Sequence, residues 1–267
     1  MLVTGATDGL GRSLATELAR RGATVLVHGR DESRGRETID EIEGETGSRE
    51  LRWYEADFAS LADVRELADR VQRDETRLDA LVCNAGIGTT LPGDGERMES
   101  HDGYELRFAI NYLAHFLLTR QLLPLIGHSA PARIVQVSSA GQAPIDFGNV
   151  MLERGYDGVQ AYCQSKLAQV MLTFDLADEL RDRRITANCL HPATYMPTKI
   201  VTHDGRSPIS SLEEGTAATL RLVVDPELDG VSGRYFDGQS EARANAQAYD
   251  VDARRRLREL SEGLVGL

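Results

Sequence analysis

Residues 4–11 read TGATDGLG, and this stretch joins a short apolar run, Leu2–Thr4, to a segment with Leu14, Leu18 and Ala19 on one helical face. Glycines are needed where a backbone turns tightly and comes within hydrogen-bonding distance of a phosphate. The N-terminus of the following helix offers free N–H groups and the positive end of a dipole. A strand, a glycine turn and a helix in this order predict a dinucleotide-binding turn. The residues expected to contact the dinucleotide here are Gly5, Thr7, Asp8, Gly9, Leu10 and Gly11.

Beyond this turn, short apolar runs rich in β-branched residues alternate with longer stretches of helical spacing. Such alternation indicates βαβ units and a parallel sheet covered by helices on both faces. The expected strands are Leu2–Thr4, Thr24–His28, Leu51–Ala56, Ala80–Cys83, Ile134–Ser138, Thr186–Leu190 and Gly233–Asp237, and the expected helices cover about residues 10–21, 32–43, 60–73, 99–126, 159–183 and 249–264. We therefore predict an α/β fold, a single doubly wound domain over residues 1–267 with a mostly parallel seven-stranded sheet.

The composition excludes several classes of partner. The formal net charge is −12, from 42 acidic and 30 basic residues, so we expect neither nucleic acid nor a membrane surface as a partner. The three cysteines and six histidines lack the spacing of a disulfide framework or a metal site, and none is expected. The apolar segment Phe108–Ile126 contains Asn111 and Arg120 and predicts a buried helix rather than a membrane span. The chain opens without a secretion signal, and we expect a cytoplasmic protein.

Two long segments without regular periodicity follow predicted strands, at residues 141–158 and 193–211. Loops after the carboxyl ends of strands form the ligand crevice of an open α/β sheet. We expect both to be walls of a substrate site, although ordinary surface loops are the alternative. The apolar side chains that would line it are Ile145, Phe147, Val150, Tyr195, Met196 and Ile200. They favour a small hydrophobic carbonyl or alcohol as the substrate.

The end of the second predicted strand bears on which dinucleotide is bound. Selectivity for NAD usually places a carboxylate there, hydrogen-bonded to the ribose hydroxyls. This strand instead ends in Gly29-Arg30, and Arg30 is suited to clamp a 2′-phosphate, with Arg12 in reach to assist. We therefore expect NADP(H) rather than NAD(H). Asp31, one residue further on, keeps NAD(H) open, and Arg30 alone is also compatible with the start of a solvated helix.

Tyr162 and Lys166 stand four residues apart in the next long helix, which follows a strand ending in Ser138-Ser139. Positions i and i+4 share one helix face, roughly 6 Å apart along the axis. A free tyrosine has a pKa near ~10, and a cation at about 4 Å contributes on the order of 4 kcal/mol, or about three pKa units. Such a lysine brings the phenol into the range of general acid/base catalysis. Taken alone, this spacing more often marks a solvated helix face.

The spacing is accompanied by other motifs in a fixed order. TGATDGLG, Asp57-Phe58, Asn84-Ala85-Gly86, Asn111, Ser139, YCQSK at 162–166 and Leu190-His191-Pro192 follow one another along the chain. This set resembles the short-chain dehydrogenase/reductase family, whose members share a Rossmann fold. The long interval from Ser139 to Tyr162, AYCQSKLA at 161–168 and SGRYF at 232–236 resemble its retinol-dehydrogenase-like branch.

The resemblance implies a role for each matching residue. The implied catalytic residues are Asn111, Ser139, Tyr162 and Lys166. Tyr162 would exchange a proton with the substrate oxygen, Lys166 would lower its pKa, and Ser139 would hydrogen-bond that oxygen. Asn111 would hold a water in the proton relay. Beyond the glycine turn, the implied cofactor-binding residues are Arg30, Asp57, Phe58, Asn84, Ala85, Gly86, Tyr162, Lys166, Pro192 and Thr194.

Two departures from the family pattern concern the loop after Pro192 and the first strand. The usual Pro-Gly is Pro192-Ala193, and Pro197 replaces the usual threonine, so Thr194 and Thr198 remain alternatives for contacting the cofactor. The first strand is also shorter than the family norm, which suggests that the reading frame begins upstream of Met1.

The expected function is an NADP(H)-dependent oxidoreductase that interconverts a carbonyl and a primary or secondary alcohol. A non-catalytic dinucleotide-binding regulatory protein of the same fold is the alternative, and an isomerase or dehydratase using the same tyrosine is a weaker one. The apolar helices expected at 99–126 and 159–183 pair between subunits in many relatives, so a homodimer or homotetramer is expected.

Overall fold

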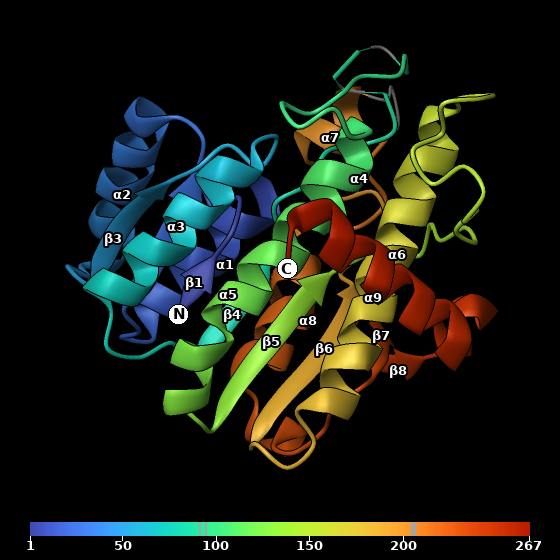
Figure 1. Cartoon of the computed structure of the whole chain (residues 1–267). Coiled ribbons are helices and arrows are strands. Elements are labelled where there is room, and N and C mark those ends of the chain that lie inside the picture. Colours follow the sequence, from blue (N-terminus) through green and yellow to red (C-terminus); the bar gives the residue numbers. More distant parts are fainter. Residues whose placement is uncertain (91, 94, 204–206) are drawn as a thin grey trace.

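The structure is a computed structural model that describes residues 1–90, 92–93, 95–203 and 207–267. Within these ranges one sheet of eight strands has the order β3-β2-β1-β4-β5-β6-β7-β8 (Figure 1). Neighbouring strands are parallel except for β7 and β8, which are antiparallel. The strands are β1 Leu2–Val3, β2 Val25–Gly29, β3 Leu51–Glu55, β4 Ala80–Cys83, β5 Ala132–Val137, β6 Ile185–His191, β7 Tyr235–Asp237 and β8 Ser240–Ala242. The predicted fold class is confirmed, with β8 as a strand beyond the seven expected.

Helices cover both faces of the sheet. The main helices are α1 Gly9–Arg20, α2 Glu32–Thr46, α3 Leu61–Asp74, α5 Ala114–His128, α6 Gly158–Glu179, α8 Leu212–Val224 and α9 Val251–Val265. Helix α1 contacts α2 and α8, whereas α3 contacts α5, and α6 contacts α9. Successive strand residues point to opposite faces, so Leu81 packs in the cluster under α3, α5 and α6 while Val82 packs in the cluster under α1 and α8.

Polar residues just before the helices fix where several of them begin. Ser60, Asp157 and Ser211 each accept a hydrogen bond from a backbone N–H in the first turn of α3, α6 and α8. Such side chains satisfy N–H groups that have no partner within the helix. At α8 the side chain of Glu214 also bonds back to the Ser211 N–H, which completes a capping box. The N-cap Asp157 therefore defines the start of α6 at Gly158, four residues before Tyr162.

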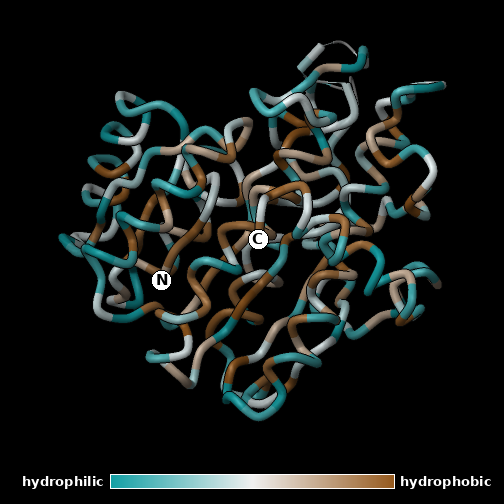
Figure 2. The backbone as a smooth tube through the Cα atoms, in the orientation of Figure 1, coloured by the Kyte–Doolittle hydropathy of each residue, from teal (hydrophilic) through white to brown (hydrophobic). Residues whose placement is uncertain are grey.

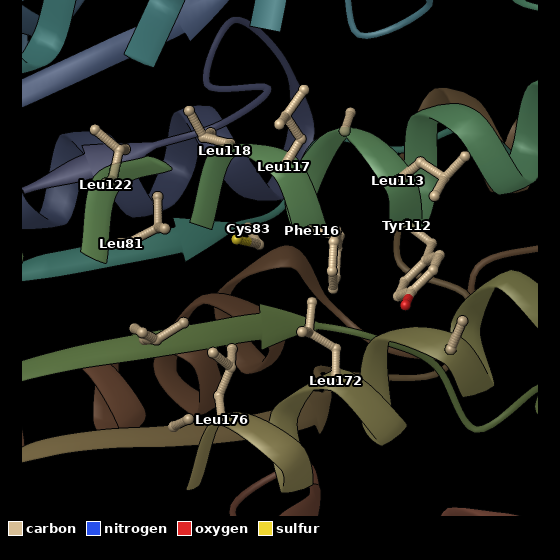
Figure 3. Close-up of a cluster of buried hydrophobic side chains, with 14 of the residues drawn as sticks. Leu81, Cys83, Tyr112, Leu113, Phe116, Leu117, Leu118, Leu122, Leu172 and Leu176 are labelled. Atoms are coloured by element: carbon tan, nitrogen blue, oxygen red, sulfur yellow. The ribbon is translucent and has the colours of Figure 1, made fainter. Parts of the chain in front are cut away.

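The larger core lies between α5, α6 and the centre of the sheet (Figure 3). Phe116, Leu117 and Leu118 of α5 and Leu176 of α6 are fully buried within this one chain. Figure 2 shows the same distribution, with hydrophobic segments inside and hydrophilic ones along the outer turns. Burial within the chain accounts for the apolar pattern that favoured an oligomer. No helix in the described ranges has the length and apolar character to cross a bilayer.

The predicted helix over 99–126 differs most from the structure. It consists of a short turn α4, Leu106–Phe108, a π-helical turn η1, Ala109–Leu113, and α5. In the π turn the N–H of Ala114 bonds to the carbonyl of Ala109, five residues back. Such turns interrupt the regular register and expose a carbonyl to other donors. Helix α8 and a short helix α7, Lys199–His203, were not predicted at all.

Candidate active site

The glycine turn between β1 and α1 takes the shape that its sequence predicts. Gly5 and Gly9 have φ angles of 63° and 48°, in the left-handed region that favours glycine. A Cβ on Gly11 would overlap the carbonyl oxygen of Gly5, so helix and turn approach closely only with glycine there. The Asp8 carboxylate accepts from the Gly9 N–H at 2.9 Å and begins α1. The turn thus leaves a narrow cradle beside the N-terminus of a helix, which suits a diphosphate.

The residues after β2 have distinct positions. Arg30 is exposed, whereas the Asp31 carboxylate accepts the Arg34 N–H at 2.9 Å as the N-cap of α2. Arg34 reaches back to the turn, where its Nε donates to the Thr7 carbonyl at 3.2 Å and its Nη2 lies 2.9 Å from Asp8. The sequence did not identify Arg34 as a site residue, because it lies 27 residues from Thr7 along the chain and comes close to it only in the fold. The Asp31 carboxylate is occupied by the helix cap.

Arg12 forms ion pairs with the neighbouring helix. Its guanidinium lies 3.2 Å from Glu41 and 2.8 Å from Glu45, both on α2. Arg12 thereby joins α1 to α2. A contact of Arg12 with a 2′-phosphate stays a prediction.

Thr4 organises the turn after β4. Its hydroxyl accepts the N–H groups of Asn84 and Ala85 at 2.8 and 2.9 Å, and it lies 3.1 Å from His115 Nε2. The Nδ1 of His115 is 3.0 Å from the backbone carbonyl of Asn111. A carbonyl only accepts, so Nδ1 carries the proton and Nε2 is the acceptor that faces Thr4 Oγ1, whose one proton also lies within reach of the Val82 carbonyl at 3.2 Å. Burial lowers the pKa of His115 to about 3 and keeps the ring neutral. This histidine, set aside at the level of sequence, connects β1, the 84–86 turn and η1.

Asp57 and Phe58, two of the residues predicted to bind the cofactor, follow the end of β3. The Asp57 carboxylate accepts the Ala59 N–H at 2.9 Å and is partly exposed. The Phe58 ring is buried, 4.4 Å from His28 and 5.2 Å from His115 between ring centroids. Only the backbone of Phe58 is therefore disposed to face a cofactor. The Nδ1 of His28 accepts a hydrogen bond from the Gly5 N–H at 3.1 Å, which fixes the glycine turn to β2.

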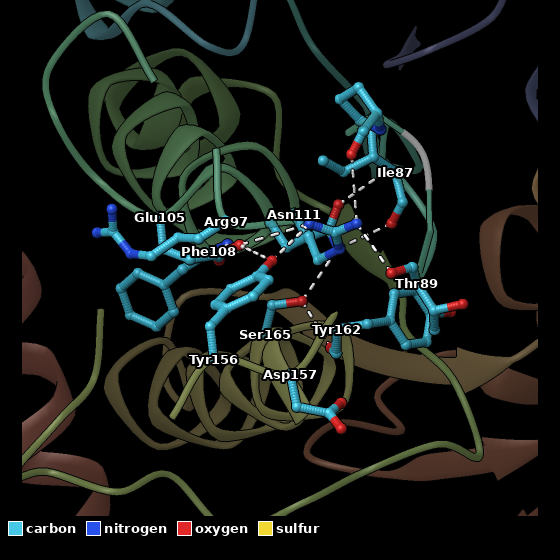
Figure 4. Close-up of polar contacts among 12 residues, drawn as sticks. Ile87, Thr89, Arg97, Glu105, Phe108, Asn111, Tyr156, Asp157, Tyr162 and Ser165 are labelled. Atoms are coloured by element: carbon cyan, nitrogen blue, oxygen red, sulfur yellow. Dashed lines mark hydrogen bonds and ion pairs between the residues drawn. The ribbon is translucent and has the colours of Figure 1, made fainter. Parts of the chain in front are cut away.

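Asn111 lies in η1 and ties three elements together (Figure 4). Its Oδ1 accepts the Ile87 N–H at 2.8 Å, and its Nδ2 donates to the Ile87 carbonyl at 3.2 Å and to Ser165 Oγ at 3.0 Å. Ser165 Oγ in turn donates to the Tyr162 carbonyl at 2.7 Å. Asn111 is fully buried. It fixes the loop after β4 against the helix that carries Tyr162.

Ser138 and Ser139 have different surroundings. Ser138 is buried, and its hydroxyl donates to the Lys166 carbonyl at 2.8 Å, which attaches β5 to α6. The hydroxyl of Ser139 accepts the Gly141 N–H at 3.1 Å and is partly exposed. A Cβ on Gly141 would lie 3.5 Å from Ser139 Oγ and 3.7 Å from Tyr162 Cε1. Ser139 and Tyr162 therefore border the same small space.

Lys166 is 5% exposed, and its Nζ lies 5.7 Å from the centre of the Tyr162 ring. Its ammonium donates to the Val137 carbonyl at 3.0 Å and to Gln169 Oε1 at 2.9 Å. Burial lowers the pKa of Lys166 to about 7. A Cβ on Gly86 would lie 3.0 Å from Asn111 Oδ1 and 3.6 Å from Lys166 Nζ. A side chain at position 86 would press on Asn111 Oδ1, so glycine lets the 84–86 turn lie close to both groups.

The segment after β6 lies over the glycine turn. Thr194 Oγ1 is 2.9 Å from His191 Nε2, whereas the Thr198 methyl would lie 3.2 Å from a Cβ on Gly9. Of the two candidate threonines, Thr198 is thus the one at the glycine turn. Lys199 extends from the same segment to Asp8, with 2.8 Å between Nζ and Oδ2. Pro192 is buried just before this segment.

The six residues expected to line the pocket differ in burial. Phe147 is partly buried against the core, with the Arg256 guanidinium 4.6 Å from its ring centroid. Ile145, Val150 and Met196 are buried in the cores, so they pack the loops rather than line an open pocket. Tyr195 and Ile200 are 37% and 40% exposed. Loop 141–158 is also fixed from outside, because Gln247 of the C-terminal segment bonds to both backbone groups of Ile145 at 2.7 and 3.2 Å.

Arg107 forms a buried polar cluster that the sequence did not suggest. Both Arg107 and Glu105 have side chains with no exposed surface, and their charged groups are 3.8 Å apart. Tyr156 bridges them, accepting from Arg107 at 2.6 Å and donating to Glu105 at 3.0 Å. Arg107 also donates to the carbonyls of Gly88 and Thr89 at 2.8 and 2.9 Å. The cluster holds the loop after β4 against loop 141–158 just before α6.

Known proteins resemble this chain over most of its length. A family model described as short chain dehydrogenase matches residues 1–207. Retinol dehydrogenase 13 of Mus musculus is 37% identical, over 100% of this chain and 84% of the relative. Among solved structures, an uncharacterized protein from Mycobacterium Paratuberculosis has a TM-score of 0.81 and 29% identity, covering 99% of this chain and 92% of the other. A short chain dehydrogenase from Shigella flexneri complexed with NADP has a TM-score of 0.72 and 31% identity, covering 89% and 95%.

Proposed function

Because the chain belongs to the short-chain dehydrogenase family, in its retinol-dehydrogenase-like branch, and is an oxidoreductase acting on CH–OH groups, we propose that it interconverts a carbonyl and a primary or secondary alcohol with NADP(H), using Tyr162 as the acid and base. The observation that carries this proposal is the convergence of Ser139, Tyr162, Lys166 and Asn111. Ser139 and Tyr162 flank Gly141, and Asn111 and Lys166 flank Gly86. A dinucleotide-binding regulatory protein would have no need of this set.

Each of these side chains has a task that its surroundings support. Ser139 offers a hydroxyl to hydrogen-bond the substrate oxygen, and Tyr162 gives that oxygen a proton or removes one. Lys166 stabilises the phenolate, since its positive charge is buried where water screens it little. Asn111 accepts from Ile87 in the loop after β4 and donates to Ser165 of α6, so it fixes that loop relative to the helix that carries Tyr162. The nicotinamide, when bound, supplies or accepts the hydride.

The residues of the turn fit a dinucleotide. Gly5, Gly9 and Gly11 leave space that a Cβ would fill, and the N-terminus of α1 faces it. Asn84 Nδ2 donates to the Thr4 and Gly5 carbonyls at 2.8 and 3.2 Å, which holds the 84–86 turn beside that space. These contacts hold the glycine turn and the 84–86 turn in fixed positions relative to each other.

The preference for NADP(H) rests on the charges after β2. Arg34 lies at the Thr7 and Asp8 end of the glycine turn, and Arg30 is exposed directly after β2. One oxygen of the Asp31 carboxylate is engaged at the N-cap of α2. A 2′-phosphate at this end of the turn would gain a charged hydrogen bond from Arg34 in exchange for its ion pair with Asp8, and Arg30 would add a second cation. The Shigella flexneri neighbour complexed with NADP supports the same choice.

We assign the substrate to the class of hydrophobic alcohols and the corresponding carbonyls. The curated relatives named as retinol dehydrogenases support this class. In this chain Tyr195 and Ile200 have partly exposed side chains in the segment after β6, and Ile200 lies against Gly88 of the loop after β4. They would offer apolar surface to a substrate bound between these two segments.

A cofactor and substrate screen tests the proposal. The expected results are tighter binding of NADPH than NADH, measured by fluorescence titration, and turnover of hydrophobic aldehydes or alcohols with NADP(H). Replacement of both Arg30 and Arg34 by alanine should reduce the ratio of the Kd for NADH to the Kd for NADPH about tenfold or more, since each charged hydrogen bond contributes about 1.5–3 kcal/mol. Arg36→Ala, on the exposed side of α2, is the control. Binding without turnover of any carbonyl or alcohol would favour the regulatory alternative.

A further inference from the structure

The Lys166 ammonium contacts a chain of two buried side-chain amides, those of Gln169 and Gln136. The Oε1 of Gln169, on the next turn of α6, accepts a hydrogen bond from the Lys166 ammonium at 2.9 Å. Its own amide nitrogen donates to Gln136 Oε1 on β5 at 3.2 Å. Both glutamines have no exposed surface. Two buried glutamines in series are costly unless their polar atoms are used.

The direction of this chain follows from its chemistry. An ammonium has only donors, so the oxygen of Gln169 must face Lys166 and its NH₂ must face away. Gln136 therefore presents its oxygen to Gln169. Its Nε2 lies beside the buried thiol of Cys83, to which it donates a hydrogen bond, and it has no nitrogen or oxygen partner. A thiol sulfur is only a weak acceptor, so the strong hydrogen bonds of this amide chain are those that lead to Lys166.

No carboxylate balances the charge of Lys166 in the described part of the chain, where no ion pair includes it. The titratable groups around it are Tyr162, whose ring centre lies 5.7 Å away, and His115, which its charge affects and which burial keeps neutral. The Cys83 thiol beyond Gln136 is also neutral, because burial raises its pKa to about 12. The partners of the ammonium are thus two neutral oxygens, the Val137 carbonyl and Gln169 Oε1.

We propose that Gln169 is a positioning residue for the reaction, which holds the Lys166 ammonium charged and in place beside Tyr162, and that Gln136 fixes Gln169 for this task. The inference rests on the proposed function for its catalytic meaning. Of the two oxygens that accept from Lys166, the Val137 carbonyl belongs to the β5 backbone. Only the Gln169 oxygen can therefore be removed by a substitution. A lysine held on two sides leaves its third N–H for a ligand or for the tyrosine.

The chain offers a direct measurement, because Lys166 and Lys199 are its only lysines. Protein labelled with ¹³C at the lysine Cε gives one NMR signal for each, and Lys199→Arg assigns them. Lys199 is 68% exposed in its side chain and serves as the internal reference. Titration of the two signals reports the ionisation of Lys166 without any substrate or cofactor.

Gln169→Leu and Gln164→Leu form a matched pair. Gln164 is also fully buried on α6, but its amide donates to the Val150 carbonyl at 2.6 Å and does not contact Lys166. Loss of one hydrogen bond to a charged group should lower the pKa of Lys166 by about one unit or more in Gln169→Leu. Gln169→Glu, which restores an acceptor with a charge, should raise the pKa above that of the wild type. Gln164→Leu should leave it unchanged.

The same variants are then compared for NADPH binding and turnover against pH. Gln169→Leu should shift the pH midpoint of activity in the direction of its lysine signal, and Gln169→Glu in the opposite direction. An unchanged Lys166 titration in Gln169→Leu, or an equal shift in Gln164→Leu, would overturn the inference. A lowered Lys166 pKa in Gln169→Leu, together with no NADPH binding even in the wild type, would support the contact between Gln169 and Lys166 but refute the proposed function. The two failures are therefore distinguishable.

Discussion

Two buried histidines should make the fold sensitive to mild acid. Burial lowers the pKa of His28 to about 4 and that of His115 to about 3, whereas the unfolded chain protonates histidine near ~6.5. Below pH ~6.5 the unfolded state therefore binds more protons than the folded state, and stability falls as the pH falls. Each histidine costs about 1.4 kcal/mol per pH unit, or about 2 kcal/mol between pH ~6.5 and ~5, so the two together cost about 4 kcal/mol.

Urea unfolding followed by circular dichroism at pH 7.5, 6, 5.5 and 5 measures this loss. His115→Gln removes one titrating ring, so its unfolding free energy should fall about 2 kcal/mol less over the same range, whatever its stability at pH 7.5. His128→Gln changes an exposed histidine at the end of α5 and should follow the wild type. Equal pH slopes for the wild type and His115→Gln would refute the reasoning, since they would mean that the buried ring titrates as it does in water.

Other perturbations act on the turn and on the buried ion pair. Gly11→Ala should abolish NADPH binding in a fluorescence titration, because its Cβ would overlap the Gly5 carbonyl, whereas Gly44→Ala on α2, with open space around it, should bind normally. Arg107→Met should lower the free energy of unfolding by about 3–5 kcal/mol, since it leaves Glu105 charged and buried without its partner. Adding Glu105→Gln should recover part of that loss, and a loss no larger than that of an exposed arginine would contradict the buried pairing.

The alternation of strands and helices was predictable because the strands β1, β2, β4, β5 and β6 are buried on both faces, which gives continuous apolar runs in the sequence. The glycine turn was predictable because backbone conformation at Gly5 and Gly9 is a local property. Helix α8 was missed although the Ser211 and Glu214 capping box marks its start, so a local signal existed and was not used. Strand β8 is only Ser240–Ala242, too short to show any pattern.

The remaining features depend on contacts between distant parts of the chain. That Asp31 caps a helix while Arg34 reaches Thr7 follows from how α2 lies against the glycine turn. The π turn at Asn111 inserts one extra residue into a helical turn. The spacing of apolar residues along the sequence is too coarse to reveal a shift of one residue. The placement of Gln169 behind Lys166 needed both the helix register and the neighbouring strand β5.

The central claim is that Tyr162 exchanges the proton with the substrate oxygen, and Tyr162→Phe tests it most directly. The measurement is kcat with NADP(H) and a substrate found in the screen, together with the Kd for NADPH. The account predicts that kcat falls by about 100-fold or more, as expected for loss of a general acid, while the Kd stays close to that of the wild type. Full turnover in Tyr162→Phe would contradict the mechanism.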